Sequence, residues 1–243
     1  MDHFENEIAF ITGGASGAGF GQAQVFGRAG CRIVIADIRP QPVEEALAQL
    51  RADGITAHGI VLDIMDRVAY ARAADEVEQV FGAPPSLLFN TAGVNSFGPV
   101  ENTSYDDFDW IVGVNLGGVI NGMVTFVPRM IASGRPGHIV TTSSLGGLMG
   151  SAFAAPYSAA KAAVINLMES YRQGLEKHNI GVSVLCPANI KSNIAEASKL
   201  RPASFGQSGY VENEDTVASL HSIHIHGMEP VQLAEYVKAG IEA

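Results

Sequence analysis

Apolar residues along the chain gather in short runs, and each run is followed by a longer segment with helical spacing. The runs are, in order, EIAFIT, RIVIAD, HGIVLD, SLLFN, HIVTTSS and GVSVLC. Alternation of this kind is typical of βαβ units, whose strands lie parallel in one sheet. Residues 8–11 are apolar toward both faces, which suits a strand covered by helices on each side. The pattern therefore predicts an α/β, doubly wound architecture with a parallel sheet.

The chain shows no sign of division into several domains. No linker, low-complexity tract or repeat interrupts its 243 residues, so we expect a single domain over 1–243. Residues from about 193 to 228 have no clear periodicity and follow the last predicted strand. Open α/β sheets bind ligands at the carboxyl ends of their strands, and long irregular segments in compact domains are usually functional. This segment therefore predicts a lid over the substrate.

Charge and cysteine usage narrow the range of partners. The formal net charge is -10 and no cluster of Lys or Arg interrupts it, which disfavours nucleic acid and anionic membranes. No uninterrupted apolar run approaches the roughly 20 residues that cross a bilayer. The two cysteines lack the spacing of a zinc site or a disulfide framework. We expect a cytoplasmic protein that acts on a small molecule.

A glycine-rich stretch, TGGASGAG, follows the first predicted strand and opens a helix. Gly13 permits a tight turn, Gly17 and Gly19 let the backbone approach a pyrophosphate, and the helix N-terminus supplies N–H groups. The strict G-x-G-x-x-G fingerprint is absent, because Gly17, Gly19 and Gly21 run G-x-G-x-G. A glycine-rich turn without a ligand is the plain alternative. Asp37, which lies 18 residues after Gly19, favours a dinucleotide site of the Rossmann type.

Asp37 also bears on which dinucleotide binds. Its carboxylate can accept the adenosine ribose hydroxyls and would repel the 2′-phosphate of NADP. Ser16 adds no cation within the glycine loop, so NAD is favoured. Arg39 is the one nearby residue that could accommodate a phosphate, and NADP stays open as the less favoured cofactor.

Tyr157 and Lys161 are four positions apart and share one face of a predicted helix. Tyrosine, with an ordinary pKa of about 10, is a poor base at neutral pH, but a nearby ammonium favours the phenolate. A hydroxyl that holds the substrate oxygen would complete a site that removes a proton from an alcohol as hydride leaves its carbon. Ser143 and Ser144 are the candidates. A chance pair on a solvated helix face is the alternative, and the dinucleotide loop upstream favours chemistry.

Several motifs together resemble the short-chain dehydrogenases/reductases over essentially the whole chain. TGGASGAG is similar to that family's T-G-x-x-x-G-x-G loop, and LDI at 62–64 is similar to its adenine-contacting acid. NTAG at 90–93 resembles its N-N-A-G stretch with Thr91 in place of the second Asn. Asn115 resembles the family's helix asparagine. The resemblance implies a Rossmann fold and transfer of a hydride to or from a nicotinamide dinucleotide.

The resemblance also implies roles for particular residues. In that family the catalytic serine usually lies 13 residues before the tyrosine, which selects Ser144 over Ser143. Tyr157 would exchange the proton, Lys161 would lower its pKa and hold the nicotinamide ribose, Asn115 would help to position a water in a proton relay, and Ser144 would orient the substrate oxygen. The cofactor-binding residues implied are Gly13, Ser16, Gly17, Ala18, Gly19, Asp37, Ile38, Asp63, Ile64, Asn90, Ala92, Tyr157, Lys161, Pro187, Ile190 and Ser192.

Two stretches depart from the family pattern. CPANIKSN at 186–193 stands where the family usually reads P-G-x-V-x-T, so Ala188 and Ser192 replace Gly and Thr. Ser192 keeps a hydroxyl for the nicotinamide carboxamide, and Ile190 can still offer its backbone N–H. The last residues, EYVKAGIEA, predict a helix where the family usually has a final strand. One edge of the sheet would then be unpaired unless a partner subunit or a further tail covers it.

Three longer stretches resemble one group within that family. NTAGVNSFGPV, CPANIKSNIAEASKLRP and SGYVENEDTVASLHSIHIHG are similar to the Cα-dehydrogenases of bacterial lignin breakdown. Those enzymes oxidise the benzylic Cα secondary alcohol of β-aryl ether dimers, of the guaiacylglycerol-β-guaiacyl ether type, to the ketone with NAD. The resemblance implies the same reaction here, on a small aromatic alcohol. A short-chain dehydrogenase/reductase for another aromatic or cyclic secondary alcohol, and a non-catalytic NAD-binding regulator, are the alternatives.

The substrate pocket should lie between the loops that follow the fourth, fifth and sixth predicted strands. Ordinary core packing is the alternative for each aromatic candidate. The candidate wall residues are Asn95, Phe97, Phe153, Asn189, Phe205 and Tyr210.

Three histidines near the end of the chain raise the question of a metal site. His221, His224 and His226 fall at i, i+3 and i+5, a spacing that does not place all three on one helix face, so we expect no metal site.

The helices that contain Asn115 and Tyr157 form subunit contacts in the resembling family. The resemblance therefore implies a homodimer or a homotetramer.

Overall fold

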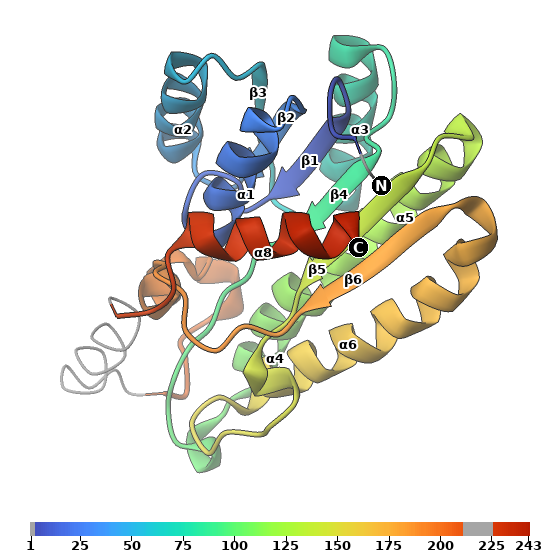
Figure 1. Ribbon diagram of the computed structural model, residues 1–243. Helices are drawn as coiled ribbons and strands as arrows, with labels where there is room; N and C mark the ends of the chain where they lie inside the picture. The colour runs from blue at the N-terminus through green and yellow to red at the C-terminus, as the bar shows by residue number, and fades with distance from the viewer. Residues whose placement is uncertain (1–2, 211–225) are drawn as a thin grey trace.

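A parallel sheet of six strands forms the centre of the protein in a computed structural model that describes residues 3–210 and 226–243. The strand order is β3-β2-β1-β4-β5-β6 (Figure 1), and each neighbouring pair is parallel. The strands are β1 (Ile8–Thr12), β2 (Arg32–Asp37), β3 (Ala57–Val61), β4 (Leu87–Asn90), β5 (Gly137–Thr142) and β6 (Ile180–Leu185).

Helices follow the strands and cover both faces of the sheet (Figure 1). The α-helices are α1 (Gly17–Arg28), α2 (Pro40–Ala52), α3 (Arg67–Phe81), α4 (Tyr105–Val112), α5 (Gly118–Ser133), α6 (Ala155–Leu175) and α8 (Pro230–Glu242). A π-helical turn, η2 (Gly113–Gly117), joins α4 to α5. Short 3-10 turns are η1 (Val100–Asn102), η3 (Leu145–Gly147), η4 (Glu176–His178), η5 (Ile194–Leu200) and η6 (Ala203–Phe205).

Alternation along the buried strands divides the core into two layers. In β1, Phe10 belongs to the cluster that also holds Phe126 of α5, whereas its neighbour Ile11 belongs to the cluster that holds Phe26 of α1. Successive side chains of a strand point to opposite faces, so a strand that is apolar at every position supplies both layers. The predicted doubly wound Rossmann fold is confirmed.

The strand order reverses between the neighbouring strands β1 and β4. From β1 the sheet continues through β2 to β3 on one side, and from β4 it continues through β5 to β6 on the other side. In open α/β sheets, ligands bind in the crevice outside the carboxyl ends of the strands at such a switch point. A ligand site is therefore expected among the loops that follow β1, β4, β5 and β6.

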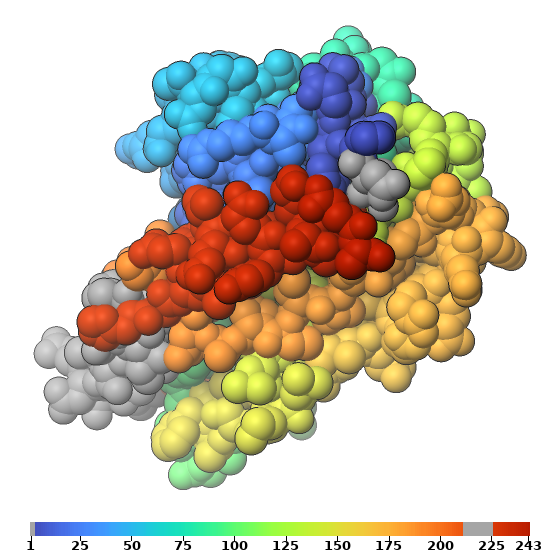
Figure 2. All heavy atoms as spheres, in the orientation of Figure 1, coloured from blue at the N-terminus to red at the C-terminus, as the bar shows by residue number. Residues whose placement is uncertain are grey.

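The C-terminal residues of the described chain form a helix, as the sequence predicts. α8 lies across the molecular surface between α1 and β6 (Figures 1 and 2). Gly21 of α1 lies so close to it that an added Cβ would stand 2.5 Å from the Pro230 carbonyl. Among the described residues, β6 is the last strand on its side of the sheet.

One helical stretch is long and apolar enough to cross a bilayer by length and composition. It spans Tyr105–Ser133, through α4, η2 and α5, and 56% of its most apolar window is buried inside the protein. This stretch contains no long uninterrupted apolar run, because polar residues such as Asn115 and Asn121 lie within it. A buried core helix of a globular protein passes the same test. Phe126 and Met123 of this stretch are fully buried in the core.

Candidate active site

The glycine loop after β1 leaves no room for side chains. Gly13 and Gly17 have φ values of 66° and 52°, which glycine adopts without strain. A Cβ added to Gly19 would stand 2.3 Å from the Gly13 carbonyl oxygen. α1 begins at Gly17, and no side chain caps its first N–H groups. Backbone donors at a helix start without a side-chain cap, lined by three glycines and the small residues Ser16 and Ala18, form a cradle for an anion such as a pyrophosphate.

Thr12 holds the glycine loop against the loop that follows β4. Its Oγ1 accepts hydrogen bonds from the backbone N–H groups of Thr91, at 3.0 Å, and Ala92, at 3.2 Å. The Thr91 hydroxyl in turn donates to Gln22 Oε1 at 2.7 Å. Thr91, which replaces the family's second Asn, therefore ties the β4 loop to α1. The two loops at the switch point lie in direct contact.

Asp37 at the end of β2 is buried and paired with Arg39. The Arg39 Nε and Nη2 atoms donate to the two Asp37 carboxylate oxygens at 2.9 and 3.0 Å, and Nη2 also donates to Ser16 Oγ at 2.8 Å. The hydrogen bonds with Asp37 raise the pKa of Arg39 against the opposing effect of burial. Asp37, which favours NAD, and Arg39, which could accommodate the phosphate of NADP, thus form a bidentate ion pair beside Ser16 of the glycine loop.

Ser144 and Ser143 have different environments at the end of β5. Ser143 is buried, and its hydroxyl donates to the Lys161 carbonyl oxygen at 2.8 Å. The Ser144 hydroxyl accepts the Gly146 N–H at 3.0 Å and is hydrogen-bonded to Tyr157. Only Ser144 therefore pairs with the tyrosine, in agreement with the choice that the family spacing implies.

Tyr157 and Lys161 lie on the first turns of α6, which starts with Pro156 in its first turn. Burial raises the pKa of Tyr157, and the hydrogen bond with Ser144 acts in the opposite direction. The Lys161 Nζ lies 5.6 Å from the Tyr157 ring centroid and donates to the Thr142 carbonyl oxygen at 2.7 Å. Burial lowers the pKa of Lys161 to about 8, against an opposing effect of Cys186. The two side chains thus lie close together, with Lys161 buried and Tyr157 partly buried, and desolvation is the largest effect on the pKa of each.

Asn115 lies in the π-helical turn and does not reach the cavity. It is fully buried, and its amide pairs with both backbone groups of Val94, at 3.0 and 2.8 Å. An added Cβ on Gly93 would stand 2.8 Å from Asn115 Oδ1 and 3.5 Å from Lys161 Nζ. Asn115 therefore fixes the loop after β4 directly beside the lysine. The π-turn itself has no signal in the sequence.

A cavity of about 240 Å³ joins the glycine loop to the Ser144, Tyr157 and Lys161 groups. Every cofactor-binding residue that the sequence predicts lines it except Asn90. Asn90 is buried beneath the cavity, where its Nδ2 donates to Thr141 Oγ1 at 3.2 Å and stabilises the β4–β5 pairing. Asp63 and Ile64, placed by resemblance alone, lie in the wall beside Asp37 and Ile38.

None of the six substrate-wall candidates lines this cavity. Tyr210 and Asn95 are buried elsewhere, and Phe153 is 54% exposed. The backbone of Asn189 is occupied by Met228, whose N–H donates to its carbonyl oxygen at 2.9 Å. Phe97 is partly buried, and Phe205 offers its carbonyl oxygen to Arg201.

Apolar residues that the sequence analysis did not single out also line the cavity. Trp110 comes from α4 and Val114 from the π-helical turn that follows it, and Leu200 and Pro202 come from the segment after β6. Sequence reasoning missed them because the two elements lie about 90 residues apart along the chain and meet only in the fold. Of the predicted lid, residues 211–225, with His221 and His224, lie outside the described residues.

Fold and site together define a nucleotide-dependent oxidoreductase, and comparison with known proteins agrees. The family model for short chain dehydrogenases matches residues 7–202, and the chain belongs to that family. It is accordingly an oxidoreductase that acts on alcohols.

Individual members of the family are similar to this chain over nearly its whole length. The chain is 76% identical over 242 residues to the C alpha-dehydrogenase of Sphingobium sp. strain SYK-6, which covers 100% of this chain and 79% of that protein. The crystal structure of LigD in its apo form, from the same strain, matches with a TM-score of 0.83 and 66% identity, over 98% of this chain and 87% of that one. A short chain dehydrogenase/reductase from Burkholderia phymatum in complex with NAD matches with a TM-score of 0.93 and 30% identity, over 99% and 87%.

Proposed function

We propose that the protein oxidises the benzylic Cα secondary alcohol of lignin-derived β-aryl ether dimers, of the guaiacylglycerol-β-guaiacyl ether type, to the ketone with NAD. The observation that carries the proposal is one cavity with the glycine loop and Asp37 at one end and Ser144 beside Tyr157 at the other. The identity of 76% with a C alpha-dehydrogenase over the whole chain supports the substrate class.

The residues present fit NAD. The glycine loop is a cradle that a single Cβ would fill, and the helix behind it lacks a side-chain cap. The buried Asp37 carboxylate offers acceptors for ribose hydroxyls and opposes a 2′-phosphate. When bound, NAD⁺ would supply the hydride acceptor for the reaction.

We assign the proton chemistry to residues of this chain. Tyr157, as the phenolate, takes the proton of the substrate hydroxyl while a hydride leaves the carbon that bears this hydroxyl. Ser144 holds the substrate oxygen. Lys161 supplies a cation behind the tyrosine ring and a donor for a ribose hydroxyl. Asn115 positions the loop at Gly93 beside Lys161, where it supports a relay of protons to solvent. Burial raises the pKa of Tyr157, so oxidation should speed up as the pH rises toward that pKa.

The remaining organisation follows the family. We propose that residues 1–243 act as one dinucleotide-binding and catalytic domain and that the segment at about 193–228 covers the substrate. Short-chain dehydrogenases are typically oligomeric, and we propose a homodimer or homotetramer. Both cysteines, Cys31 and Cys186, are free thiols, which suits a cytoplasmic location.

Formation of NADH tests the proposal directly. Purified protein is mixed with NAD⁺ and guaiacylglycerol-β-guaiacyl ether, and NADH absorbance is followed, with Tyr157→Phe as the matched control. We expect turnover that falls by about 10³-fold in the variant, the scale of general-base catalysis. No NADH from any benzylic alcohol would refute the reaction, and an equally active Tyr157→Phe would refute the mechanism. NAD binding without turnover would favour a regulator.

A further inference from the structure

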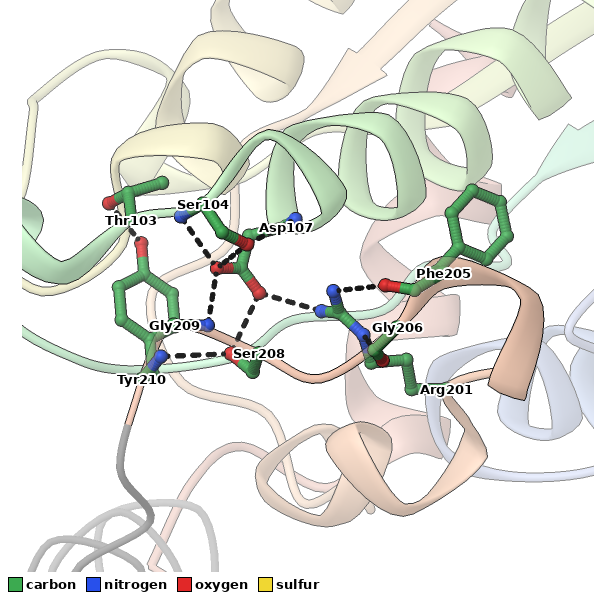
Figure 3. Close-up of polar contacts among 9 residues, drawn as sticks. All are labelled: Thr103, Ser104, Asp107, Arg201, Phe205, Gly206, Ser208, Gly209 and Tyr210. Carbon is green, nitrogen blue, oxygen red and sulfur yellow. Dashed lines mark hydrogen bonds and ion pairs between the residues drawn. The ribbon is translucent and has the colours of Figure 1, made fainter.

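A partly buried polar cluster outside the reacting groups joins α4 to the segment after β6 (Figure 3). Asp107, in the first turn of α4, is its centre. One carboxylate oxygen accepts from the Ser104 N–H, at 2.9 Å, the Ser104 hydroxyl, at 2.7 Å, and the Gly209 N–H, at 3.0 Å. The other accepts from Arg201 Nη1, at 2.6 Å, and the Ser208 hydroxyl, at 2.7 Å. We call Ser104, Asp107, Arg201, Ser208 and Gly209 the Asp107 hub.

Arg201 makes the hub rigid from the other side. Its Nη2 donates to the Phe205 carbonyl oxygen at 2.9 Å, and its Nε donates to the Gly206 carbonyl oxygen at 3.2 Å. The side chains of Asp107 and Arg201 are 0% and 8% exposed. Because a planar guanidinium holds several acceptors in one fixed geometry, the turn at 201–206 and the start of α4 are locked to each other.

Close backbone packing extends the hub toward residue 210. The Tyr210 hydroxyl hydrogen-bonds with Thr103 Oγ1 at 2.8 Å, and its ring packs on Gly98, where an added Cβ would stand 2.3 Å away. A Cβ on Gly209 would stand 1.9 Å from the Asn102 carbonyl oxygen. These contacts bury Tyr210, which explains why this residue does not line the cavity.

The Asp107 hub contacts residues that line the cavity through Arg201, both by side-chain packing and along the chain. The Arg201 guanidinium lies 5.5 Å from the ring centroid of Trp110, and Trp110 lines the cavity. Leu200 and Pro202, the chain neighbours of Arg201, line the cavity as well. A shift of Arg201 would therefore move three wall residues together, while the glycine loop and Asp37 lie on other elements.

We infer that the Asp107–Arg201 ion pair is a positioning device that sets the substrate wall formed by Trp110, Leu200 and Pro202. Neither residue touches the reacting atoms. The inference rests on the proposed function for its substrate, since a β-aryl ether dimer has a second ring that needs a wall beyond the catalytic groups. The hub then determines how well the two-ring alcohol is held, and it leaves NAD binding unaffected.

Asp107→Asn is the principal test, because it keeps the shape of the side chain and removes its charge. We expect the KM for guaiacylglycerol-β-guaiacyl ether to rise roughly tenfold, since small displacements of positioning groups have effects of that size. The KM for a single-ring alcohol, 1-phenylethanol, should rise by less, and the KM for NAD should stay within about twofold. Equal increases in all three values would mean a general loss of structure and would overturn the inference.

Ser208→Ala serves if Asp107→Asn fails to fold. It removes one hydrogen bond to Asp107 and leaves no buried charge unpaired, so we expect a change of about threefold in the same direction. The matched control is Asp53→Asn, which breaks the exposed ion pair between Arg28 of α1 and Asp53, the residue that follows α2. Asp53→Asn should leave the KM for both alcohols unchanged. A lower melting temperature in Ser208→Ala with no change in any KM would also overturn the inference.

Tryptophan fluorescence supplies a readout that does not depend on turnover. The chain has one tryptophan, Trp110, which lies under Arg201. Acrylamide should quench it more strongly in folded Asp107→Asn than in the wild type, and equally in the wild type and Asp53→Asn. Unchanged quenching would overturn the inference even if the enzyme is active. A wild type inactive on every benzylic alcohol would refute the proposed function alone, because the quenching test of the wall would still stand.

Discussion

The two ends of the cavity are built in contrasting ways. The cofactor end depends on residues close together in sequence, Gly13 to Gly19 and Asp37 to Arg39, and much of its shape comes from missing side chains. The proposed substrate end depends, by our inference, on the Asp107 hub, in which Arg201 and Ser208 lie 94 and 101 residues from Asp107. The first end is specified by backbone conformation and the second by a buried charge network. The two ends should therefore respond to different perturbations.

Gly19→Ala should have the largest effect and should be confined to the cofactor end. The new Cβ would stand 2.3 Å from the Gly13 carbonyl oxygen, which the backbone cannot avoid without moving. We expect a loss of about 4 kcal/mol in the free energy of unfolding and a loss of NAD binding, measured by urea unfolding and calorimetric titration. Gly174→Ala is the control: nothing lies within 4 Å of its Cβ position on α6. It should stabilise the protein by about 0.5–1 kcal/mol. Normal NAD binding by Gly19→Ala would contradict the assignment.

Lys161→Met tests the boundary between the two ends. Burial lowers the pKa of Lys161 to about 8, so the folded state opposes the charged form below that pH. This cost to stability is complete below about pH 8 and disappears as the pH rises to the ordinary lysine value of about 10.5. We expect the inactive variant to be more stable than the wild type at pH 7, by about 2–3 kcal/mol after the lost Thr142 hydrogen bond is subtracted.

The advantage of Lys161→Met should shrink between pH 8 and pH 10.5, as measured by urea unfolding at each pH. A constant difference across this range would show that the ammonium is not desolvated in the folded protein.

Acid should weaken the substrate end. Burial raises the pKa of Asp107, but hydrogen bonds from Ser104, Ser208 and Gly209 outweigh it and bring the pKa to about 2, from an ordinary 3.8. A depressed pKa adds stability above the unfolded value, and that stability is lost as the pH falls from about 4 to about 2. The wild type should lose about 2 kcal/mol more than Asp107→Asn over this window. Parallel pH profiles of the two proteins would contradict the role of the carboxylate.

Asp37→Ser should have the smallest effect and should change only the choice of cofactor. It removes the carboxylate that opposes a 2′-phosphate and releases Arg39 from its bidentate pair. We expect the ratio of kcat/KM for NAD to that for NADP to fall about tenfold, or 1.4 kcal/mol. The KM for the alcohol should not change, with Asp37→Glu as the charge-preserving control. An unchanged ratio would show that Asp37 does not discriminate.

Local motifs predicted a set of cofactor-binding residues of which all but Asn90 line the cavity. The strand runs predict all six strands, and the glycine spacing places Gly13, Gly17 and Gly19 because a tight turn and a close anion approach constrain neighbouring residues. Asn90 is the exception: it belongs to the motif but lies beneath the cavity, where it pairs with Thr141. A motif match does not distinguish a residue that binds a ligand from one that holds the strand beside it.

What the sequence by itself determined is the set of groups whose geometry is local: the order of strands and helices, the glycine turn, and the four-residue spacing of Tyr157 and Lys161. Only the tertiary structure decided that Trp110, Leu200 and Pro202 line the cavity and that Tyr210 is buried without lining it. The physical reason is distance along the chain. A helical spacing brings two side chains together by backbone geometry alone, whereas Asp107 and Arg201 meet only because the packing of the whole domain brings their segments together.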